Sequence, residues 1–187
     1  MISVFPDVFI LKPKLFIDNR GSFMESFNLK EIQTYTKRKI DFCQDNQVFS
    51  KKGVIRGMHY QLPPFSQSKL VRVTQGKVLD VIIDIRKGST TFGKYFSKEL
   101  SAENQLQLFV PRGFAHGYIT LSETSIFHYK VDQYYHPQSE ESIAPDDPDL
   151  GIDWKISETD WIQSEKDKKY SRLSDANLFD YNHDLYA

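Results

Sequence analysis

The stretch Lys69-Leu-Val-Arg-Val-Thr-Gln-Gly-Lys-Val-Leu-Asp-Val-Ile-Ile-Asp-Ile85 decides the fold class of this chain. Lys69 to Thr74 is rich in β-branched residues, and apolar and polar residues alternate from Val71 to Thr74, which is typical of a β-strand. Gln75-Gly76-Lys77 is a turn sequence, and Val78 to Ile85 is an apolar run rich in β-branched residues. We therefore expect two strands joined by a tight turn, with the second strand returning as the partner of the first.

The period-two alternation extends on both sides, from about residue 54 to 135, and helical periodicity is nearly absent there. Leu106–Val110 and Ser125–Tyr135 are further predicted strands. Many short strands with closely spaced turns are typical of a β-sandwich or barrel. Two short helices are predicted outside this region, one from Leu29 to about Lys37 and one from Ser164 to about Tyr170.

The overall composition narrows the class of protein. A chain of 187 residues fits one domain, 1–187, with a full hydrophobic core. Its 24 basic and 25 acidic side chains give no basic field for a nucleic-acid partner, and no apolar run approaches the roughly 20 residues of a membrane span. The single Cys43 has no partner in the chain and no apolar leader precedes Phe5, so we expect a reducing, cytoplasmic compartment and a small-molecule partner.

A second segment, Gly53-Val-Ile-Arg-Gly-Met-His-Tyr-Gln61, carries candidate chemistry. It places His59 close to Arg56, and Lys69 follows shortly after it. An imidazole can take a proton from carbon when nearby cations hold the negative charge that forms. Because Arg56 and His59 have opposite parity on a strand, we expect a bulge or bend at Gly57 that brings both to one site.

Strand parity predicts which other side chains face inward. Lys69 and Arg72 have opposite parity, so Lys69 is expected inside and Arg72 outside. Tyr129 and Tyr135 share the odd parity of Phe127, so both tyrosines would point into the barrel from one strand. A phenol has an ordinary pKa of about 10, and we expect nearby cations to lower the pKa of Tyr129 enough for it to act as an acid.

Six ordered blocks of sequence span nearly the whole chain. They are Gln44–Asn46, Gly53–Gln61, Pro111–Gly117, Tyr129–Lys130 with Tyr134–Tyr135, Gly151–Trp154 and Ser164–Asp167. Together they resemble the dTDP-4-dehydrorhamnose 3,5-epimerase family. The resemblance implies an all-β, cupin-type jelly-roll barrel with a few short peripheral helices, no metal or organic cofactor, and a homodimer that exchanges N-terminal strands.

The resemblance also implies a reaction. It is the inversion of C3 and C5 of a dTDP-linked 4-keto-6-deoxyhexose, dTDP-4-dehydro-6-deoxy-D-glucose, through enolate intermediates to give dTDP-4-dehydro-L-rhamnose. Inversion beside a ketone needs a base and an acid on opposite faces of the sugar. The family pattern makes His59 the base, Asp167 its carboxylate partner and Tyr129 the acid, while Lys69 and Arg56 hold the enolate and the substrate.

Other residues match family positions that bind substrate or nucleotide. These are Arg20, Phe23, Glu25, Gln44, Asp45, Asn46, His116, Glu140 and Lys166, and Tyr135 matches the tyrosine that stacks on thymine. Two of the motifs have other interpretations. Ser164-x-x-Asp167 is also a helix capping box, and Pro111-x-Gly-x-x-His116 resembles the second metal motif of cupins. Because the first metal motif is represented here by His59 alone, we expect no metal.

The sequence departs from the commoner family pattern in two places. These are Val131-Asp132-Gln133 and Ala144-Pro145, which flank the tyrosine expected to stack on the base. They leave open the exact nucleotide sugar and whether one carbon or two are inverted. A single-position C3 or C5 epimerase of a related nucleotide 4-ketosugar is therefore an alternative, and a non-catalytic cupin that binds sugar nucleotides is a third hypothesis.

Overall fold

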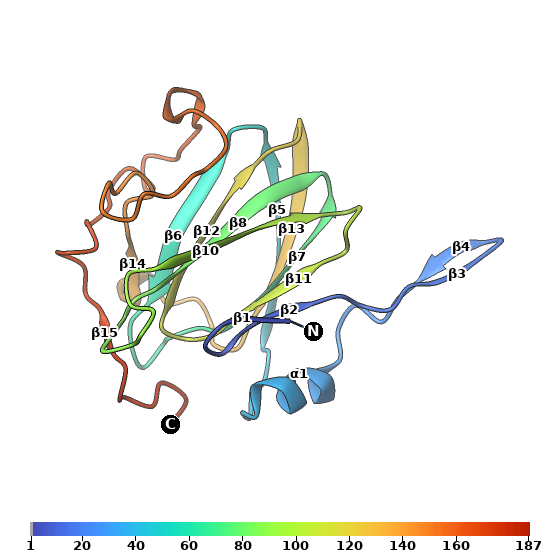
Figure 1. The fold of residues 1–187 in the computed structure, drawn as a ribbon, viewed down its shortest axis with the longest axis horizontal. Helices are drawn as coiled ribbons and strands as arrows, with labels where there is room; N and C mark the ends of the chain where they lie inside the picture. Colours follow the sequence, from blue (N-terminus) through green and yellow to red (C-terminus); the bar gives the residue numbers. More distant parts are fainter. Residues whose placement is uncertain (1) are drawn as a thin grey trace.

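Two antiparallel sheets packed face to face form the body of the molecule (Figure 1). The computed structural model describes the backbone of residues 2–187 and the side chains from residue 5 onward. One sheet has the strand order β1-β2-β11-β7-β13-β5, and the other has the order β10-β8-β12-β6-β14. The all-β jelly roll predicted from the sequence is confirmed.

The elements have the following bounds. The six-stranded sheet contains β1 (Ile2–Phe5), β2 (Val8–Leu11), β5 (Gln44–Lys51), β7 (Lys69–Gln75), β11 (Gln107–Val110) and β13 (Thr124–Val131). The five-stranded sheet contains β6 (Ile55–Gln61), β8 (Lys77–Asp84), β10 (Tyr95–Ser101), β12 (Phe114–Thr120) and β14 (Glu140–Ser142). Outside the sheets lie β3 (Phe16–Asp18), β4 (Gly21–Phe23), β9 (Arg86–Lys87), β15 (Phe179–Asp180), helix α1 (Leu29–Thr36) and the 3-10 turns η1 (Pro137–Ser139) and η2 (Glu158–Asp160).

The turn at Gln75–Lys77 connects the two sheets. The strands on either side of it form as predicted, but β7 pairs with β11 and β13, whereas β8 pairs with β10 and β12. The prediction that the second strand returns beside the first is therefore wrong. Turn chemistry specifies a reversal of the chain but not the sheet that the next strand joins. A strand such as β8, whose residues after Lys77 are all buried, gains most in the middle of a sheet that is covered on both faces.

Three apolar layers account for this burial. Between the sheets lie side chains such as Val71, Ile82 and Phe127. The C-terminal segment, residues 143–187, covers the outer face of the five-stranded sheet, where Trp154 belongs to the same buried cluster as Val81. Helix α1 covers part of the outer face of the six-stranded sheet. The two faces of β8 are therefore both removed from water, which is why it carries hydrophobic residues at successive positions.

Helix α1 confirms the prediction of a helix from Leu29 to about Lys37. The side chain of Asn28 caps it by accepting hydrogen bonds from the backbone N–H groups of Lys30 and Glu31. The other predicted helix, Ser164 to about Tyr170, is wrong, because these residues form bends and turns. The charged run after Ser164 offers no apolar stripe to bury, and a short helix without tertiary packing is not stable in water.

Strand β6 is bulged at Gly57, as predicted. Its pairing with β12 shifts register between Arg56 and His59, where two residues of β6 oppose the single residue Gly117. Gly57 has a φ of +118°, and a Cβ atom there would lie 2.4 Å from the Cα atom of Gly117. The bulge brings Arg56 and His59 to the same cavity although their sequence parity is opposite.

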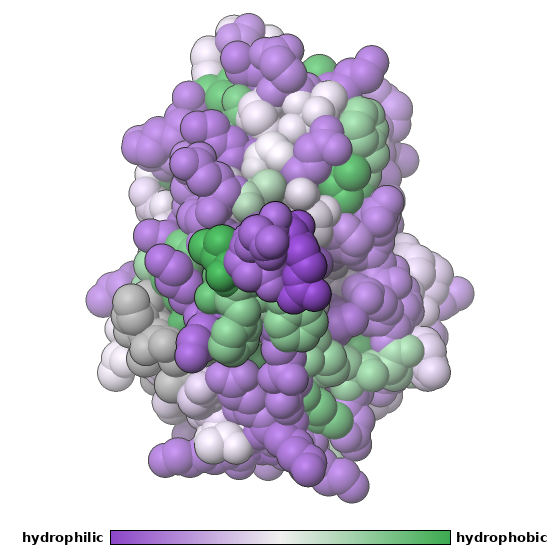
Figure 2. Space-filling model, turned by 90° about the vertical axis from the view of Figure 1, so that its right-hand side faces the viewer, coloured by the Kyte–Doolittle hydropathy of each residue, from purple (hydrophilic) through white to green (hydrophobic). Residues whose placement is uncertain are grey.

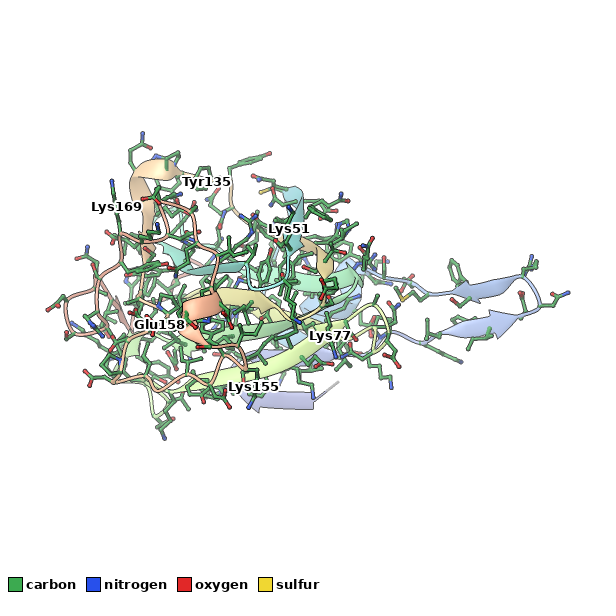
Figure 3. The ribbon with its side chains drawn as sticks, turned by 90° about the horizontal axis from the view of Figure 1, so that it is seen from above. Lys51, Lys77, Tyr135, Lys155, Glu158 and Lys169 are labelled. Atoms are coloured by element: carbon green, nitrogen blue, oxygen red, sulfur yellow. The ribbon has the colours of Figure 1, made fainter. Side chains whose placement is uncertain are left out.

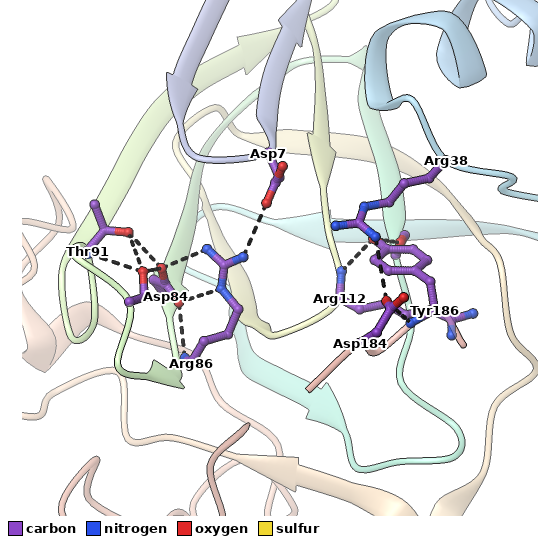
Figure 4. Close-up of polar contacts among 10 residues, drawn as sticks. Asp7, Arg38, Asp84, Arg86, Thr91, Arg112, Asp184 and Tyr186 are labelled. Atoms are coloured by element: carbon purple, nitrogen blue, oxygen red, sulfur yellow. Dashed lines mark hydrogen bonds and ion pairs between the residues drawn. The ribbon is translucent and has the colours of Figure 1, made fainter. Parts of the chain in front are cut away.

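Two polar clusters tie the ends of the chain to the sandwich (Figure 4). In the first, Asp84 accepts hydrogen bonds from Arg86, and Arg86 also reaches Asp7 in the turn between β1 and β2. In the second, the Tyr186 hydroxyl accepts the backbone N–H of Arg112 at 3.0 Å, and the Arg112 guanidinium lies 4.8 Å from the centre of the Tyr186 ring. Arg86 thus connects to the N-terminal turn, and Arg112 connects to Tyr186 near the C-terminus.

Strands β3 and β4 form a projecting hairpin that extends away from the sandwich (Figures 1 and 3). Its apolar side chains are unusually exposed, with Ile17 78% and Phe23 69% accessible. Figure 2 looks onto this end of the molecule and shows green, hydrophobic surface beside and below a purple, hydrophilic centre. Within the described residues, no helix reaches the length and apolarity of a membrane span.

The bulge leads to a prediction about stability. Gly57→Ala should lower the free energy of unfolding by about 3 kcal/mol, because the added methyl meets backbone atoms that cannot move away independently. Gly151→Ala is the matched control, since Gly151 also has a positive φ, of +57°, but no atom within 4 Å of an added Cβ. It should cost only about 1 kcal/mol. Urea denaturation of both variants measures the difference, and equal losses would contradict the steric argument.

Candidate active site

One cavity lies between the two sheets, where β6 and β12 face β7 and β13. It has a volume of about 300 Å³ and contains all four side chains predicted to be catalytic, namely His59, Lys69, Tyr129 and Asp167. Five of the residues predicted to bind substrate also line it, namely Arg56, His116, Tyr135, Glu140 and Lys166. The cavity therefore combines one candidate base, one candidate acid and several cations.

His59 and Asp167 form a hydrogen-bonded pair. The Nε2 atom of His59 lies 2.8 Å from Oδ1 of Asp167, and both side chains are largely buried. Burial by itself would raise the pKa of Asp167, but the hydrogen bond and charge of His59 hold that pKa below its ordinary value. The backbone N–H of Asp167 also donates to Ser164 Oγ at 3.1 Å. The capping contact and the pair with His59 therefore coexist, without a helix.

Tyr129 faces the cavity from the opposite sheet. His59 belongs to β6 of the five-stranded sheet, whereas Tyr129 belongs to β13 of the six-stranded sheet. Burial raises the pKa of Tyr129 and the nearby Glu140 raises it further, while Arg56 only partly opposes them. The prediction that cations lower this pKa is wrong, because desolvation of the phenol outweighs the attraction of Arg56. The phenol is thus held in the protonated form that an acid requires.

Lys69 carries its charge into the interior of the sandwich. Burial lowers the pKa of Lys69 to about 8, although Glu140 and Asp80 act in the opposite direction. Its ammonium group lies 3.4 Å from the carbonyl oxygen of His59, which places it beside the candidate base. Arg72, its neighbour of opposite parity, does not line the cavity, as predicted. A desolvated cation in this position can stabilise an oxyanion that develops close to the base.

His116 has a partner that sequence reasoning missed. The Nε2 atom of His116 lies 2.9 Å and 3.1 Å from the two carboxylate oxygens of Asp80, and both residues are buried. Burial raises the pKa of Asp80, while His116 and Lys69 counteract that shift. The signal for Asp80 is an acidic residue inside the apolar run of β8, which has to find a buried partner. Asp80 thereby orients the His116 ring and supplies negative charge near Lys69.

Arg56 also has a support that the sequence did not reveal. Its Nε atom donates to Ser50 Oγ at 3.2 Å, and the same hydroxyl lies 3.2 Å from the phenol oxygen of Tyr118. Ser50 is on β5 and Tyr118 is on β12, so the hydroxyl that accepts from Arg56 is itself fixed by a contact between the two sheets. Such contacts between strands remote in sequence leave no local pattern.

A polar group of three residues stands at the mouth of the cavity. The Tyr135 hydroxyl donates to Glu140 Oε2 at 2.8 Å, and Lys166 lies 3.1 Å from that hydroxyl and forms an ion pair with Glu140. Burial by itself would raise the pKa of Glu140, but the bonds from Lys166 and Tyr135 hold it below its ordinary value. The expectation that Tyr135 continues the strand of Tyr129 is wrong, because β13 ends at Val131 and a loop carries Tyr135 to the mouth.

The remaining predicted residues lie outside the cavity wall of this chain. Gln44 and Asn46 of β5 bond to each other at 2.8 Å, and Asp45 pairs with Lys130. Arg20, Phe23 and Glu25 lie on or just after the projecting hairpin, with Arg20 paired to Asp18 and Glu25 accepting from Asn28. Figure 3 shows this hairpin far from Tyr135. Within residues 2–187, no group of three or more His, Cys, Asp or Glu side chains is placed to hold a metal ion.

The family profile and the curated relatives that match this chain carry the same description. The sequence profile of dTDP-4-dehydrorhamnose 3,5-epimerase matches residues 3–175. The protein of that name from Shigella flexneri is 47% identical over 174 residues, which cover 93% of this chain and 95% of the relative.

Solved structures agree with the sequence match. The crystal structure of dTDP-4-dehydrorhamnose 3,5-epimerase from Elizabethkingia anophelis superimposes with a TM-score of 0.91 at 47% identity, covering 95% of this chain and 97% of that one. That of dTDP-6-deoxy-D-glucose-3,5-epimerase from Legionella pneumophila, in complex with dTDP-4-keto-L-rhamnose, gives a TM-score of 0.91 at 42% identity and covers 97% of each chain. Sequence and structure together place this chain in the dTDP-4-dehydrorhamnose 3,5-epimerase family.

Proposed function

We propose that this chain is an epimerase that inverts C3 and C5 of dTDP-4-dehydro-6-deoxy-D-glucose to give dTDP-4-dehydro-L-rhamnose. The observation that carries the proposal is the placement of His59 and Tyr129 on opposite sheets around one cavity, with Asp167 on the His59 ring. A base and an acid on opposite sides are what inversion requires, since a single group would return the proton to the face it left. The names of the relatives support the same substrate.

The proposed mechanism has two proton transfers at each carbon. His59 removes the proton from the carbon next to the C4 ketone. The electron pair of that C–H bond forms a double bond to C4, and the π pair of the ketone moves to the C4 oxygen to give an enolate. Asp167 stabilises the imidazolium that results. Lys69 holds the negative charge on the C4 oxygen, and Tyr129 then gives its proton to the opposite face of the carbon. Solvent returns a proton to Tyr129 and removes one from His59, so that the pair is ready for the second carbon.

The mouth of the cavity fits the nucleotide end of the substrate. Lys166 has a side chain that is 62% accessible and can meet a diphosphate. The ring of Tyr135 is 48% accessible and can stack on a flat base. In this arrangement the sugar reaches His59 while the thymidine stays at the surface.

We further propose that a second copy of the chain completes the site. The projecting hairpin exposes Ile17 and Phe23, and surfaces of this kind are typical of protein interfaces. In a homodimer that exchanges N-terminal elements, the hairpin of one protomer would bring Arg20, Phe23 and Glu25 to the cavity of its partner. The location in the cytoplasm remains a prediction from the sequence.

Deuterium incorporation tests the reaction. In deuterated water with dTDP-4-dehydro-6-deoxy-D-glucose, NMR should show label at both C3 and C5, because each inversion passes a solvent-derived proton through Tyr129. Label at one carbon alone would indicate a single-position epimerase, and label at neither would indicate a binding protein. His59→Ala should abolish the label while nucleotide affinity changes only a few-fold, since the base acts mainly in the transition state. If the His59→Ala variant still incorporated deuterium, His59 would not be the base.

The pH dependence tests Lys69. Because burial lowers the pKa of Lys69 to about 8, its cation is present below that pH and lost above it, so kcat/KM should fall above about pH 8. Lys69→Met should lower kcat by about 100-fold and remove this alkaline limb. Lys69→Arg keeps its charge at high pH, so the limb should move to higher pH whatever the residual activity. An unchanged limb in Lys69→Arg would contradict the assignment.

Mixing two inactive variants tests whether the hairpin of a second copy of the chain completes the site. Phe23→Ala combined with Arg20→Ala should inactivate one chain through its hairpin, and His59→Ala inactivates another through its cavity. Refolded together, the two chains should regain activity, because each heterodimer contains one site with an intact cavity and an intact partner hairpin. Light scattering should give the mass of a dimer. Absence of complementation in confirmed heterodimers would mean that the hairpin does not act on the partner.

A further inference from the structure

His59 lies between two carboxylates, one on each ring nitrogen. Its Nε2 atom is hydrogen-bonded to Asp167, whereas its Nδ1 atom is buried, has no hydrogen-bond partner, and lies 3.7 Å from Oε1 of Glu140. Buried polar atoms without a partner are rare in proteins and call for an explanation. Of the described residues that line the cavity, only Asp167 and Glu140 are carboxylates.

The protonation state of the base explains the unpartnered nitrogen. A neutral imidazole has one N–H donor, and here the bond from Nε2 to Asp167 uses it. The Nδ1 atom then has only a lone pair, which a carboxylate cannot satisfy. After His59 has taken a proton from carbon, both nitrogens are donors, and Nδ1–H faces Glu140. The contact with Glu140 therefore becomes favourable only when the base is protonated, which stabilises the state after proton removal.

The position of Glu140 is fixed by the sheet and by the mouth of the cavity. Strand β14 pairs with β6 so that Glu140 stands opposite Gln61 and Ser142 opposite His59. The second oxygen of Glu140 is held by Tyr135 and Lys166. These are the side chains proposed above to meet the nucleotide. A diphosphate bound to Lys166 would weaken the ion pair between Lys166 and Glu140. The negative charge of Glu140 would then be less neutralised and would interact more strongly with His59.

We propose that Glu140 is a positioning residue for the base, in that it stabilises protonated His59 and, through Lys166, links the strength of the base to occupancy of the nucleotide end. The proton itself stays on His59 until solvent removes it, and Glu140 remains ionised throughout. This inference rests on the proposed function, because it assumes that His59 is the base.

Other titratable groups line the same cavity as His59. They include Arg56 of its own strand, Lys69 of β7, His116 of β12, Tyr129 of β13, and Asp167 with Lys166 from the C-terminal segment. The cations Arg56, Lys69 and Lys166 disfavour a positive charge at His59, and Asp167 favours it. Removing the charge of Glu140 leaves a single carboxylate to oppose these cations. The protonated form of His59 should therefore become less stable, by an amount that the pH profile can measure.

The test is the acidic limb of the pH profile of kcat/KM, measured with the dTDP-linked 4-ketosugar. Glu140→Gln keeps the size of the side chain and removes its charge, which favours neutral His59. Its acidic limb should move to lower pH by about one unit, and kcat on the plateau should fall about tenfold. Lys166→Met removes a cation beside Glu140, so its acidic limb should move to higher pH, opposite in sign. Lys166 is exposed, so this second variant does not depend on core packing.

Glu141→Gln is the matched control. Glu141 is the next residue of β14, and its side chain bonds to Asn177 at 3.0 Å and does not line the cavity. Its profile should be that of the wild type. A higher KM for Glu140→Gln without movement of the limb would overturn the inference and leave Glu140 as a substrate contact. Wild-type enzyme without deuterium incorporation would instead overturn the proposed function itself.

Discussion

The hydrogen bond between His59 and Asp167 is the interaction on which the site depends. It joins a strand of the five-stranded sheet to the C-terminal segment, and it fixes which nitrogen of the imidazole carries the proton. The same bond holds Asp167 at the cavity wall, although the residues around it form no regular helix. Without it the C-terminal segment would lose a buried anchor, and the His59 ring would lose the hydrogen-bond partner of its Nε2 atom.

Buried charge is the second constraint. Lys69, Asp80 and His116 lie in the interior, where an isolated charge would be costly, and each has an oppositely charged or hydrogen-bonding neighbour. Balance is incomplete at Lys69, whose pKa falls to about 8 because of burial. An incompletely compensated cation is suited to an anion that exists only during a reaction, which is the part that the proposed mechanism gives to Lys69.

The two ends of the site have different physical characters. The deep end is built from strands of both sheets, which position His59, Lys69 and Tyr129. The mouth is built from loops and short elements, where the exposed Tyr135 and Lys166 both bond to the carboxylate of Glu140. Glu140 touches both ends, which is why a residue assigned to substrate binding by resemblance can also influence the base. The projecting hairpin adds a third component that this chain does not direct at its own cavity.

The sequence by itself determined the strands, the first helix, the bulge at Gly57 and the residue types of the site. These features follow from period-two alternation, helix start and stop signals, strand parity and ordered motifs, all of which are local or depend on resemblance. Only the tertiary structure decided that β8 joins the second sheet, that Ser164–Tyr170 is not a helix, that a loop delivers Tyr135, that Asp80 supports His116, and that burial raises the pKa of Tyr129. The reason is that strand pairing, desolvation and partner choice arise from contacts between segments far apart in the chain, and no local pattern records them.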